Sequence, residues 1–287
     1  MPIETVAIVG VGLIGGSFAL ALRKAGFGGR ILGVSSPRTV EAALERHVID
    51  EAQPLAEALP AADLVYLAQP IDRILETIEK IDSLLRPGAL VTDAGSTKAR
   101  IAEAGARAIR RGQFLGGHPM AGKETRGVEE AEADLFAGRT YVLTPDGPRD
   151  METPAAMEFL EWIRRMGGVP VFLDPVEHDR VVSWTSHLPQ LASTALAGAV
   201  ARGIDIAAYG RVAGPGIRDM TRLALSSFDV WHDILATNRA EIEHALDAYI
   251  AELRELRTRV ADPELNKEFE AGAQFAARLR RTQQENA

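Results

Sequence analysis

Six residues near the N-terminus form a Gly-x-Gly-x-x-Gly pattern, Gly10-Val11-Gly12-Leu13-Ile14-Gly15. Apolar residues 5–9 before the pattern indicate a buried strand, and residues 14–25 after it indicate a helix. In this setting the glycines permit a tight turn, a close approach of backbone to pyrophosphate, and close packing of helix on strand. The free amides at the helix N-terminus attract the phosphates. The pattern predicts a nicotinamide dinucleotide site rather than an ordinary glycine turn. Its expected contacts are Gly10, Gly12, Leu13, Ile14 and Gly15.

The residues after the second expected strand, 30–34, distinguish NAD from NADP. NAD-binding folds usually place Asp or Glu there to bind the ribose 2′-hydroxyl. This chain has Ser35, Ser36 and Arg38 at that place, and no acid. A carboxylate would repel a 2′-phosphate, whereas two hydroxyls and a guanidinium can bind it. The loop therefore favours NADP, with NAD as the alternative. If it does not bind phosphate, Arg38 is a solvated loop charge.

Several further segments combine polar side chains with the ends of expected elements. Two follow strands in the first half of the chain, and three lie in helical stretches of the second half. They are Asp93-Ala94-Gly95-Ser96-Thr97-Lys98, Gly116-Gly117-His118-Pro119-Met120-Ala121-Gly122, Ser186-His187-Leu188-Pro189-Gln190, Ile217-Arg218-Asp219-Met220-Thr221-Arg222 and Trp231-His232-Asp233-Ile234. Imidazole, hydroxyl and guanidinium groups suit proton transfer, hydrogen bonding and carboxylate binding.

Together these segments resemble the prephenate and arogenate dehydrogenases of tyrosine biosynthesis. The shared motifs are Gly-Leu-Ile-Gly-Gly-Ser, Asp-Ala-Gly-Ser-Thr-Lys, His-Pro-Met-Ala-Gly and Ser-His-Leu-Pro, in this order. The resemblance implies a cyclohexadiene substrate with a 4-hydroxyl and a ring carboxylate. Hydride leaves C4 for the nicotinamide, the carboxylate leaves as carbon dioxide, and aromatisation makes the step irreversible. Such chemistry needs a base, a hydrogen-bonding group near C4, and cations for the carboxylates.

The resemblance assigns roles to individual residues. His118 is similar to the family's catalytic histidine, which accepts the hydroxyl proton; the alternative is a structural histidine at a strand end. Ser96 is similar to the serine that binds the substrate hydroxyl and orients His118; the alternative is a helix N-cap. Arg222 is similar to the arginine that receives a substrate carboxylate. Arg218, four residues earlier on the same helical face, assists it or pairs with a surface acid.

Four more residues complete the expected substrate pocket. His187 lines the pocket in the family, with core packing as the alternative. Trp231 forms a wall of the pocket or packs between helices, and Glu124 is an acid near the entrance or a solvated loop residue. Many prephenate-using relatives have a second histidine where this chain has Gln190. Because an amide carbonyl can accept a hydrogen bond from an ammonium group, Gln190 favours arogenate over prephenate, and dual use remains open.

Two patterns divide the chain. Up to residue 173, β-rich runs alternate with amphipathic stretches, which is typical of a parallel sheet covered on both faces. The expected strands are 5–9, 30–34, 64–68, 89–93, 113–116, 140–143 and 169–172, and the helices between them include 14–25, 40–46, 71–85 and 98–110. After residue 174 only helices are expected, at 176–200, 216–226, 230–260 and 263–281, with a kink at Pro189.

The expected fold is therefore an α/β protein: a Rossmann-type dinucleotide-binding domain, residues 1–173, followed by an all-helical substrate and dimerisation domain, residues 174–287. The helical half has too few residues to bury every apolar face, which predicts a homodimer through that half.

Composition limits the other function classes. The formal net charge of -8, without a long basic run, argues against a nucleic-acid partner. The absence of cysteine excludes disulfides, thiolate metal sites and a cysteine nucleophile, and no metal site is expected. The N-terminus lacks the basic start of a signal peptide, and glycines interrupt the first apolar run. We expect a cytoplasmic protein without a membrane span.

Two alternatives to the family's reaction are a 3-hydroxyacid dehydrogenase and a non-catalytic, dinucleotide-sensing dimer. Dehydrogenases of the first kind normally use a lysine base on a long helix of the second domain. This chain has no lysine between Lys123 and Lys267. The presence of Ser96, His118 and the other expected site residues argues against a sensor.

Overall fold

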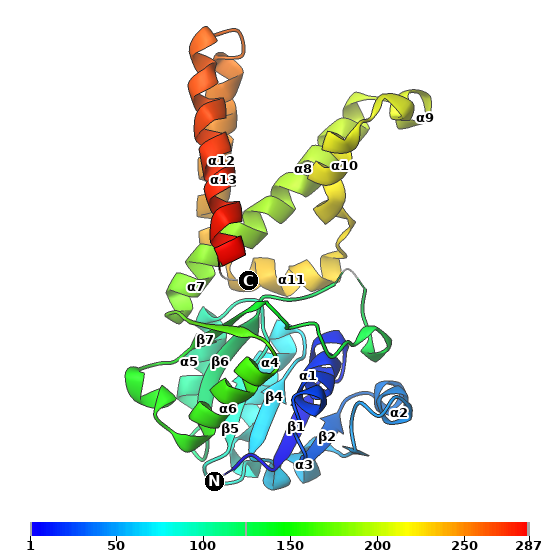
Figure 1. Ribbon diagram of the computed structural model, residues 1–287, viewed down its shortest axis with the longest axis vertical. Helices are drawn as coiled ribbons and strands as arrows, with labels where there is room; N and C mark the ends of the chain where they lie inside the picture. Colours follow the sequence, from blue (N-terminus) through cyan, green and yellow to red (C-terminus); the bar gives the residue numbers. More distant parts are fainter. Residues whose placement is uncertain (1, 124, 286–287) are drawn as a thin grey trace. The chain divides into compact units, whose positions relative to one another are not determined.

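The computed structural model describes residues 2–123 and 125–285. The chain forms two compact units, Met1–Arg239 and Ala240–Ala287. The first unit contains all the strands and the helices up to Thr237, and the second contains two long helices (Figure 1). A domain boundary at residue 173 follows the last strand but is not where these units divide, so that boundary stays a prediction.

One eight-stranded sheet forms the centre of the first unit. Its strands are β1 (Thr5–Val9), β2 (Arg30–Val34), β3 (Glu51–Ala52), β4 (Leu64–Leu67), β5 (Leu90–Asp93), β6 (Gln113–Pro119), β7 (Thr140–Thr144) and β8 (Val169–Phe172). They lie in the order β3-β2-β1-β4-β5-β6-β7-β8. All seven expected strands are present, and the two-residue β3 is an addition.

The sheet departs from the expected all-parallel pattern at one pair. The strands from β3 to β6 are parallel, and β7 pairs with β8 in parallel, but β6 and β7 are antiparallel, with His118 opposite Val142. An antiparallel pair needs no crossover helix. The chain between β6 and β7 accordingly contains only a short 3-10 turn, Val128–Glu130, among its described residues.

Helices cover both faces of the sheet, because alternate strand residues point to opposite sides. One buried cluster includes Val6 and Ile8 of β1, and the other includes Ala7 and Val9. The first face is packed by α1 (Leu13–Lys24), α2 (Pro37–Glu45) and α6 (Pro154–Arg165). The second is packed by α3 (Leu55–Ala61), α4 (Ile71–Ile81) and α5 (Ala99–Ala108).

The helices after the sheet are more broken than expected. They are α7 (Pro175–Val182), a π-helical turn at Ser183–His187, α8 (Leu188–Gly203), α9 (Ile206–Tyr209), α10 (Pro215–Thr221), a 3-10 turn at Arg222–Leu225, α11 (Phe228–Thr237), α12 (Arg239–Thr258) and α13 (Asn266–Glu285). Pro189 lies in the first turn of α8, directly after the π-helical turn, so the α-helical hydrogen bonding is interrupted next to the proline as its missing amide donor predicts. The expected helix 230–260 is interrupted at Asn238.

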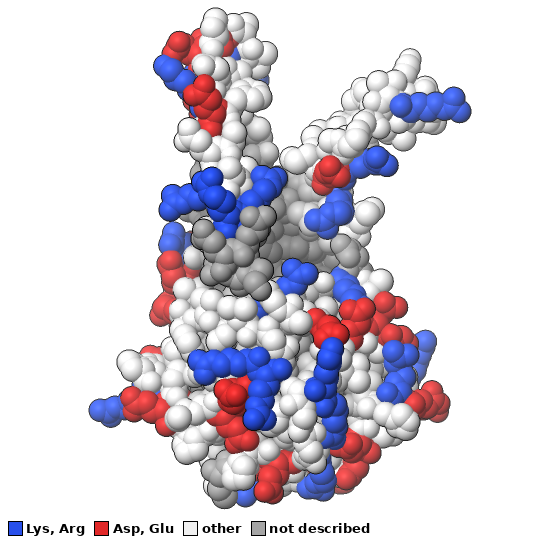
Figure 2. Space-filling view, in the orientation of Figure 1, with Lys and Arg blue, Asp and Glu red and all other residues white. Residues whose placement is uncertain are grey.

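Within the described ranges, no single helix is long and apolar enough to cross a membrane. The bent pair Pro175–Gly203 and Ile206–Val212 meets the criteria of length and composition only when its two parts are taken together. On the face that Figure 2 shows, acidic and basic side chains are interspersed over the part of the chain that contains the sheet.

Candidate active site

The parallel strands bring the predicted loops to one edge of the sheet. The glycine loop follows β1, Ser35 follows β2, Ser96 lies shortly after β5, and His118 lies at the end of β6. The strand order reverses beside β1, since β2 and β4 lie on its two sides. In sheets of this kind ligands bind at the carboxyl ends of the strands next to such a reversal.

The three glycines of the loop differ in the space that the fold leaves for a side chain. Gly10 has a φ of 98°, and a Cβ there would lie 2.6 Å from the Ala68 carbonyl oxygen. A Cβ on Gly15 would lie 2.1 Å from the carbonyl oxygen of Gly10. A Cβ on Gly12 would meet no described heavy atom within 4 Å. The first and third glycines are thus needed by the fold, whereas the second faces open space at the N-terminus of α1.

Two cavities meet beside this loop and share Ala68, Gln69 and Pro70. The first, of about 520 Å³, is lined among others by Gly10, Gly12, Ser35, Ser36 and Thr39. The second, of about 320 Å³, is lined among others by Ile14, Gly95, Ser96, Arg126 and Asp229. We call these two adjoining cavities the dinucleotide groove, because they lie where the glycine loop predicts a dinucleotide. Motif analysis did not find Gln69, Pro70, Thr39 or Arg126, because these residues join the groove only through folding.

The second and third glycines of the loop, Gly12 and Gly15, make a testable contrast. We expect Gly15→Ala to destabilise the fold by about 1–3 kcal/mol, because the added methyl group overlaps the loop backbone. Gly12→Ala should change the melting temperature little but weaken dinucleotide binding at least about tenfold, since the methyl group occupies the space that the pyrophosphate needs. Thermal unfolding and cofactor titration measure the two effects. Equal loss of stability in both variants would contradict this assignment.

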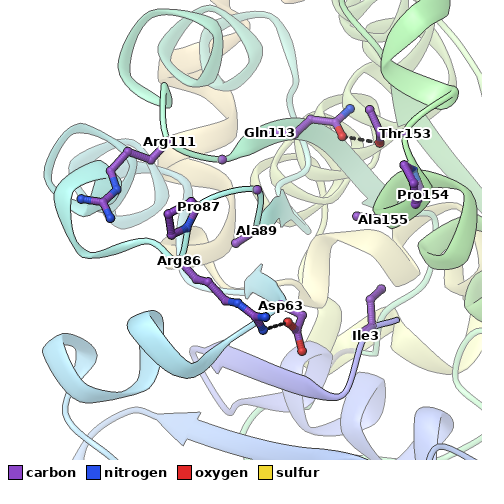
Figure 3. A pocket seen from close by; sticks show the side chains of 12 residues that line it. Ile3, Asp63, Arg86, Pro87, Ala89, Arg111, Gln113, Thr153, Pro154 and Ala155 are labelled. Atoms are coloured by element: carbon purple, nitrogen blue, oxygen red, sulfur yellow. Dashed lines mark hydrogen bonds and ion pairs between the residues drawn. The ribbon is translucent and has the colours of Figure 1, made fainter. Parts of the chain in front are cut away.

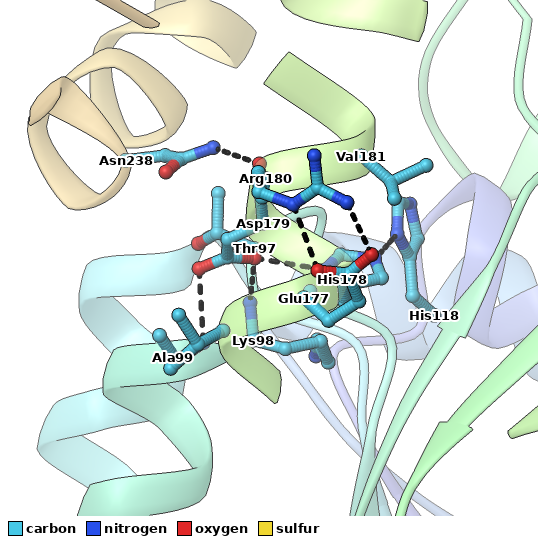
Figure 4. A network of polar contacts seen from close by, with 12 residues as sticks. Thr97, Lys98, Ala99, His118, Glu177, His178, Asp179, Arg180, Val181 and Asn238 are labelled. Carbon is cyan, nitrogen blue, oxygen red and sulfur yellow. Dashed lines mark hydrogen bonds and ion pairs between the residues drawn. The ribbon is translucent and has the colours of Figure 1, made fainter. Parts of the chain in front are cut away.

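His118 is part of a buried chain of hydrogen bonds (Figure 4). Its Nδ1 lies 2.8 Å from Nε2 of His178, and Nδ1 of His178 lies 2.8 Å from Oδ1 of Asp179. The carboxylate of Asp179 accepts hydrogen bonds from the backbone amides of Lys98, at 2.7 Å, and Ala99, at 2.9 Å. The chain therefore connects the end of β6 to the start of α5 through α7.

A buried ion pair lies next to His118. The Lys98 ammonium pairs with Asp93 and donates to the carbonyl oxygen of Gly117 at 2.8 Å, and the Gly117 amide donates to Asp93 at 3.1 Å. These bonds hold the ends of β5 and β6 together. Burial lowers the pKa of His118 well below its usual value, and the neighbouring His178 and Lys98 lower it further. His118 is therefore neutral at physiological pH and able to accept a proton.

His187 is connected to the same hydrogen-bond network through Asn238. The Asn238 amide donates to the backbone oxygen of Asp179 at 2.8 Å, and its Nδ2 lies 3.3 Å from Nδ1 of His187. Because Nδ2 is a donor, Nδ1 of His187 accepts and its Nε2 carries the ring proton. The Trp231 ring packs edge-on against His187, with centroids 5.8 Å apart. Two residues predicted from motifs are thus in direct contact.

His187 makes a prediction about stability and pH. Burial lowers its pKa from 6.5 to about 4. Above pH 6.5 the folded and unfolded states are both neutral at this residue, but below it only the unfolded state gains the proton, so stability falls as the pH falls. At pH 5 we expect His187 to cost about 2 kcal/mol relative to pH 8. Urea unfolding of wild type and His187→Gln at both pH values measures this cost; parallel pH dependences would contradict it.

Gln190 is buried on α8, and its amide is oriented by two acceptors. Nε2 donates to the backbone oxygen of Leu223 at 2.8 Å and lies 3.4 Å from Oγ1 of Thr194. Its carbonyl oxygen is therefore the end that can accept a further hydrogen bond. Arg218 and Arg222 are exposed, on α10 and the following 3-10 turn, both of which pack against α8.

Ser96 is half-buried and lines the smaller cavity. It does not cap α5, because Asp179 accepts the first amides of that helix. Thr97 does not cap it either: its hydroxyl lies 2.8 Å from that of Thr237. The polar environment of Ser96 is thus the cavity itself.

The remaining predicted residues have different positions. Ser36 caps α2 through the Thr39 amide, at 3.4 Å, and also lines the larger cavity. Arg38 is exposed in the first turn of α2 and is not among the residues that line this cavity. Glu124 lies outside the described residues.

A third cavity, of about 290 Å³, lies at the opposite edge of the sheet (Figure 3). Ile3, Asp63 and Ala89 line it just before β1, β4 and β5 begin, and Arg86 pairs with Asp63 there. It contains none of the residues predicted to act in the site.

Sequence reasoning missed His178, Asp179 and Asn238. One signal for His178 was present, because it lies four residues before the apolar Val182 and so on the same helical face. Its partners belong to distant segments, which no local pattern connects.

Two family models match most of the chain. The model described as prephenate dehydrogenase, nucleotide-binding domain, matches residues 18–168, and the model described as prephenate dehydrogenase, dimerization domain, matches residues 174–275. The chain is 34% identical over 271 residues to the prephenate dehydrogenase of Bacillus subtilis (strain 168), covering 93% of this chain and 72% of that protein.

Solved structures agree with this match. The prephenate dehydrogenase from A. aeolicus, solved in complex with hydroxyphenyl propionate and NAD+, superposes with a TM-score of 0.88 at 30% identity, covering 97% of this chain and 99% of that one. The arogenate dehydrogenase of Synechocystis superposes with a TM-score of 0.82 at 33% identity, covering 96% and 99%. The chain belongs to the prephenate dehydrogenase family.

Proposed function

We propose that this protein catalyses the oxidative decarboxylation of arogenate or prephenate in tyrosine biosynthesis, with NADP or NAD as the hydride acceptor. The observation that carries this proposal is the buried imidazole of His118 at the carboxyl edge of the sheet that also carries the dinucleotide groove. A neutral imidazole accepts a proton there, and the groove suits an oxidised nicotinamide.

Each site residue has a part in the proposed reaction. Ser96 binds the 4-hydroxyl of the substrate, and His118 removes its proton. The glycine loop and the residues lining the two cavities would hold an oxidised nicotinamide, which would supply the acceptor for the hydride of C4. The electrons of the bond to the ring carboxylate then aromatise the ring as carbon dioxide leaves, and the phenolate oxygen takes the proton back from His118. Arg222 binds a substrate carboxylate, and the Nε2–H of His187 donates a further hydrogen bond.

We favour arogenate as the substrate because of Gln190. The Leu223 carbonyl and the Thr194 hydroxyl take its amide hydrogens, so its oxygen presents an acceptor. The arogenate side chain has an ammonium group, which only donates, whereas the prephenate side chain has a keto group, which only accepts. An acceptor at this position selects the ammonium group.

We favour NADP because the described residues that line the larger cavity include Ser35, Ser36 and Thr39 but no acid. Arg38, in the first turn of α2, can reach a 2′-phosphate as a flexible cation. We expect Arg38→Ala to weaken NADP binding about 10–150-fold and leave NAD binding nearly unchanged, since a single charge-assisted hydrogen bond contributes about 1.5–3 kcal/mol. Titration with both cofactors measures this, and equal losses for both would refute the assignment.

The proposed function is tested by crossing both substrates with both cofactors. Purified protein receives prephenate or arogenate with NAD or NADP, and the reduced cofactor is followed optically. We expect turnover, with the highest kcat/KM for arogenate and NADP. A higher kcat/KM for prephenate would overturn the Gln190 assignment. No turnover in any mixture, with cofactor still bound, would overturn the proposed function in favour of a dinucleotide sensor.

We also propose that the protein is a homodimer through its helical half. Large apolar side chains are exposed in both units, including Val212, Leu225 and Phe228 in the first, and Phe269 and Phe275 in the second. Such surface is normally covered in a soluble protein. Light scattering should give twice the chain mass of 30.9 kDa; a monomer at micromolar concentration would contradict the proposal.

A further inference from the structure

We infer that His178 and Asp179 are positioning residues that fix the ring tautomer of His118, leaving the lone pair on its Nε2. The inference rests on the proposed function in one respect, since it names Nε2 as the atom that takes the substrate proton. It concerns two residues that no sequence motif indicated. The chain of hydrogen bonds Asp179–His178–His118 is called the relay below.

The direction of the relay is set at Asp179. Its two oxygens accept the backbone amides of Lys98 and Ala99, and a carboxylate has no proton to donate. The remaining bond, to Nδ1 of His178, therefore uses a proton on that nitrogen. Neutral His178 then has its lone pair on Nε2. That lone pair accepts from Nδ1 of His118, 2.8 Å away, so the ring proton of His118 lies on Nδ1 and Nε2 is the base.

The relay is held rigidly and away from solvent. The His178 side chain is completely buried, and Asp179 is 2% exposed. The Asn238 side chain holds the backbone oxygen of Asp179, and α7 packs against α5 (Figure 4). Because the N-terminus of a helix favours negative charge, α5 stabilises the carboxylate. Through the single His178 ring, Asp179 in turn fixes the orientation and tautomer of His118.

The charged and titratable groups around His118 leave its hydrogen bond to His178 undisturbed. Lys98 faces it from the start of α5, His178 from α7 and His187 from the π-helical turn, and each disfavours the protonated ring. The Lys98 charge is paired with Asp93. None of these groups competes with His178 for Nδ1 of His118 among the described hydrogen bonds.

Four variants separate the relay from a merely structural role. His178→Leu removes the relay. His178→Gln keeps its direction, because the amide nitrogen can donate to Asp179 and the amide oxygen can accept from His118. Asp179→Asn removes the carboxylate charge and turns one of the two acceptor oxygens into a donor, so the proton on Nδ1 of His178 is held less strongly. Asp174→Asn is the matched control: Asp174 caps the N-terminus of α7 through the amides of Val176 and Glu177, without contact to the relay.

Two readouts are taken on the full-length protein. Long-range ¹H–¹⁵N spectra of histidine-labelled protein report which nitrogen of His118 carries the proton, with the resonance identified by its loss in His118→Asn. Steady-state rates with the better substrate give kcat and KM. We expect wild type, His178→Gln and Asp174→Asn to have the proton on Nδ1. We expect His178→Leu and Asp179→Asn to place it partly or wholly on Nε2, and to lower kcat about 10²–10⁴-fold with little change in KM.

The possible outcomes test the relay and the proposed function separately. A proton on Nε2 in wild type, or equal losses of kcat in His178→Gln and His178→Leu, would overturn the relay. The predicted spectra without turnover of either substrate would support the relay and overturn the proposed function. Equal loss of stability and kcat in Asp174→Asn and Asp179→Asn would show a capping role and overturn the relay.

Discussion

His118→Asn is expected to lower kcat about 10²–10⁴-fold and to change KM little. The asparagine amide nitrogen can take the place of Nδ1 and keep the hydrogen bond to His178, so the buried network stays intact. What the variant lacks is Nε2, the nitrogen that is free to receive the hydroxyl proton. Because the proton leaves while hydride departs, the loss should affect the transition state rather than substrate binding.

Initial rates of nicotinamide reduction, measured over a range of substrate concentrations, test this expectation. Cofactor affinity and melting temperature serve as controls and should be close to wild type, since His118 is not among the residues lining the dinucleotide groove. A near-normal kcat would remove His118 from the role of base. A raised KM with normal kcat would make it a binding residue instead.

Arg222→Ala is expected to raise KM for the substrate about 30–1000-fold, with a much smaller loss of kcat. A guanidinium can hold a carboxylate with two charge-assisted hydrogen bonds, and together these contribute about 2–4 kcal/mol. A carboxylate that binds equally in the ground state and the transition state affects KM rather than kcat. The exposed position of Arg222 beside α8 suits contact with an entering substrate.

Arg222→Lys is the matched comparison, because it keeps the charge but not the planar pair of donors. Its KM should lie between those of wild type and Arg222→Ala. If Arg222→Ala instead lowered kcat and left KM unchanged, the arginine would act chiefly in the transition state. If neither variant changed either constant, Arg222 would not contact the substrate.

Local patterns predicted most of the sheet domain. The alternation of apolar runs with amphipathic stretches placed all seven expected strands, because buried parallel strands and their crossover helices have distinct periodicities. The two-residue β3 is too short to leave such a pattern. The antiparallel β7 has the same apolar composition as a parallel strand, so its direction depends on the connection from β6 and not on its own residues.

Tertiary contacts decided where the later helices break. Residues 230–260 have a continuous helical pattern, yet α11 ends at Thr237 and α12 begins at Arg239. The intervening Asn238 donates its side-chain amide to Asp179 and His187, and these partners lie more than fifty residues earlier in the chain. No window of local sequence contains that information.

Local sequence likewise identified only part of the candidate site. Motifs indicated Ser96, His118, His187 and Trp231, and the structure joins the last two directly. The motifs did not indicate His178 or Asp179, although these determine which nitrogen of His118 can act. Motif residues name the chemical groups of a site, whereas their protonation and orientation depend on buried partners from other elements.

The stoichiometry of the reaction tests the central claim most directly. Arogenate or prephenate is incubated with excess oxidised cofactor, and carbon dioxide, reduced nicotinamide and the aromatic product are measured in the same sample. Oxidative decarboxylation predicts equal amounts of all three. Reduced nicotinamide without carbon dioxide, or carbon dioxide without reduced nicotinamide, would contradict it.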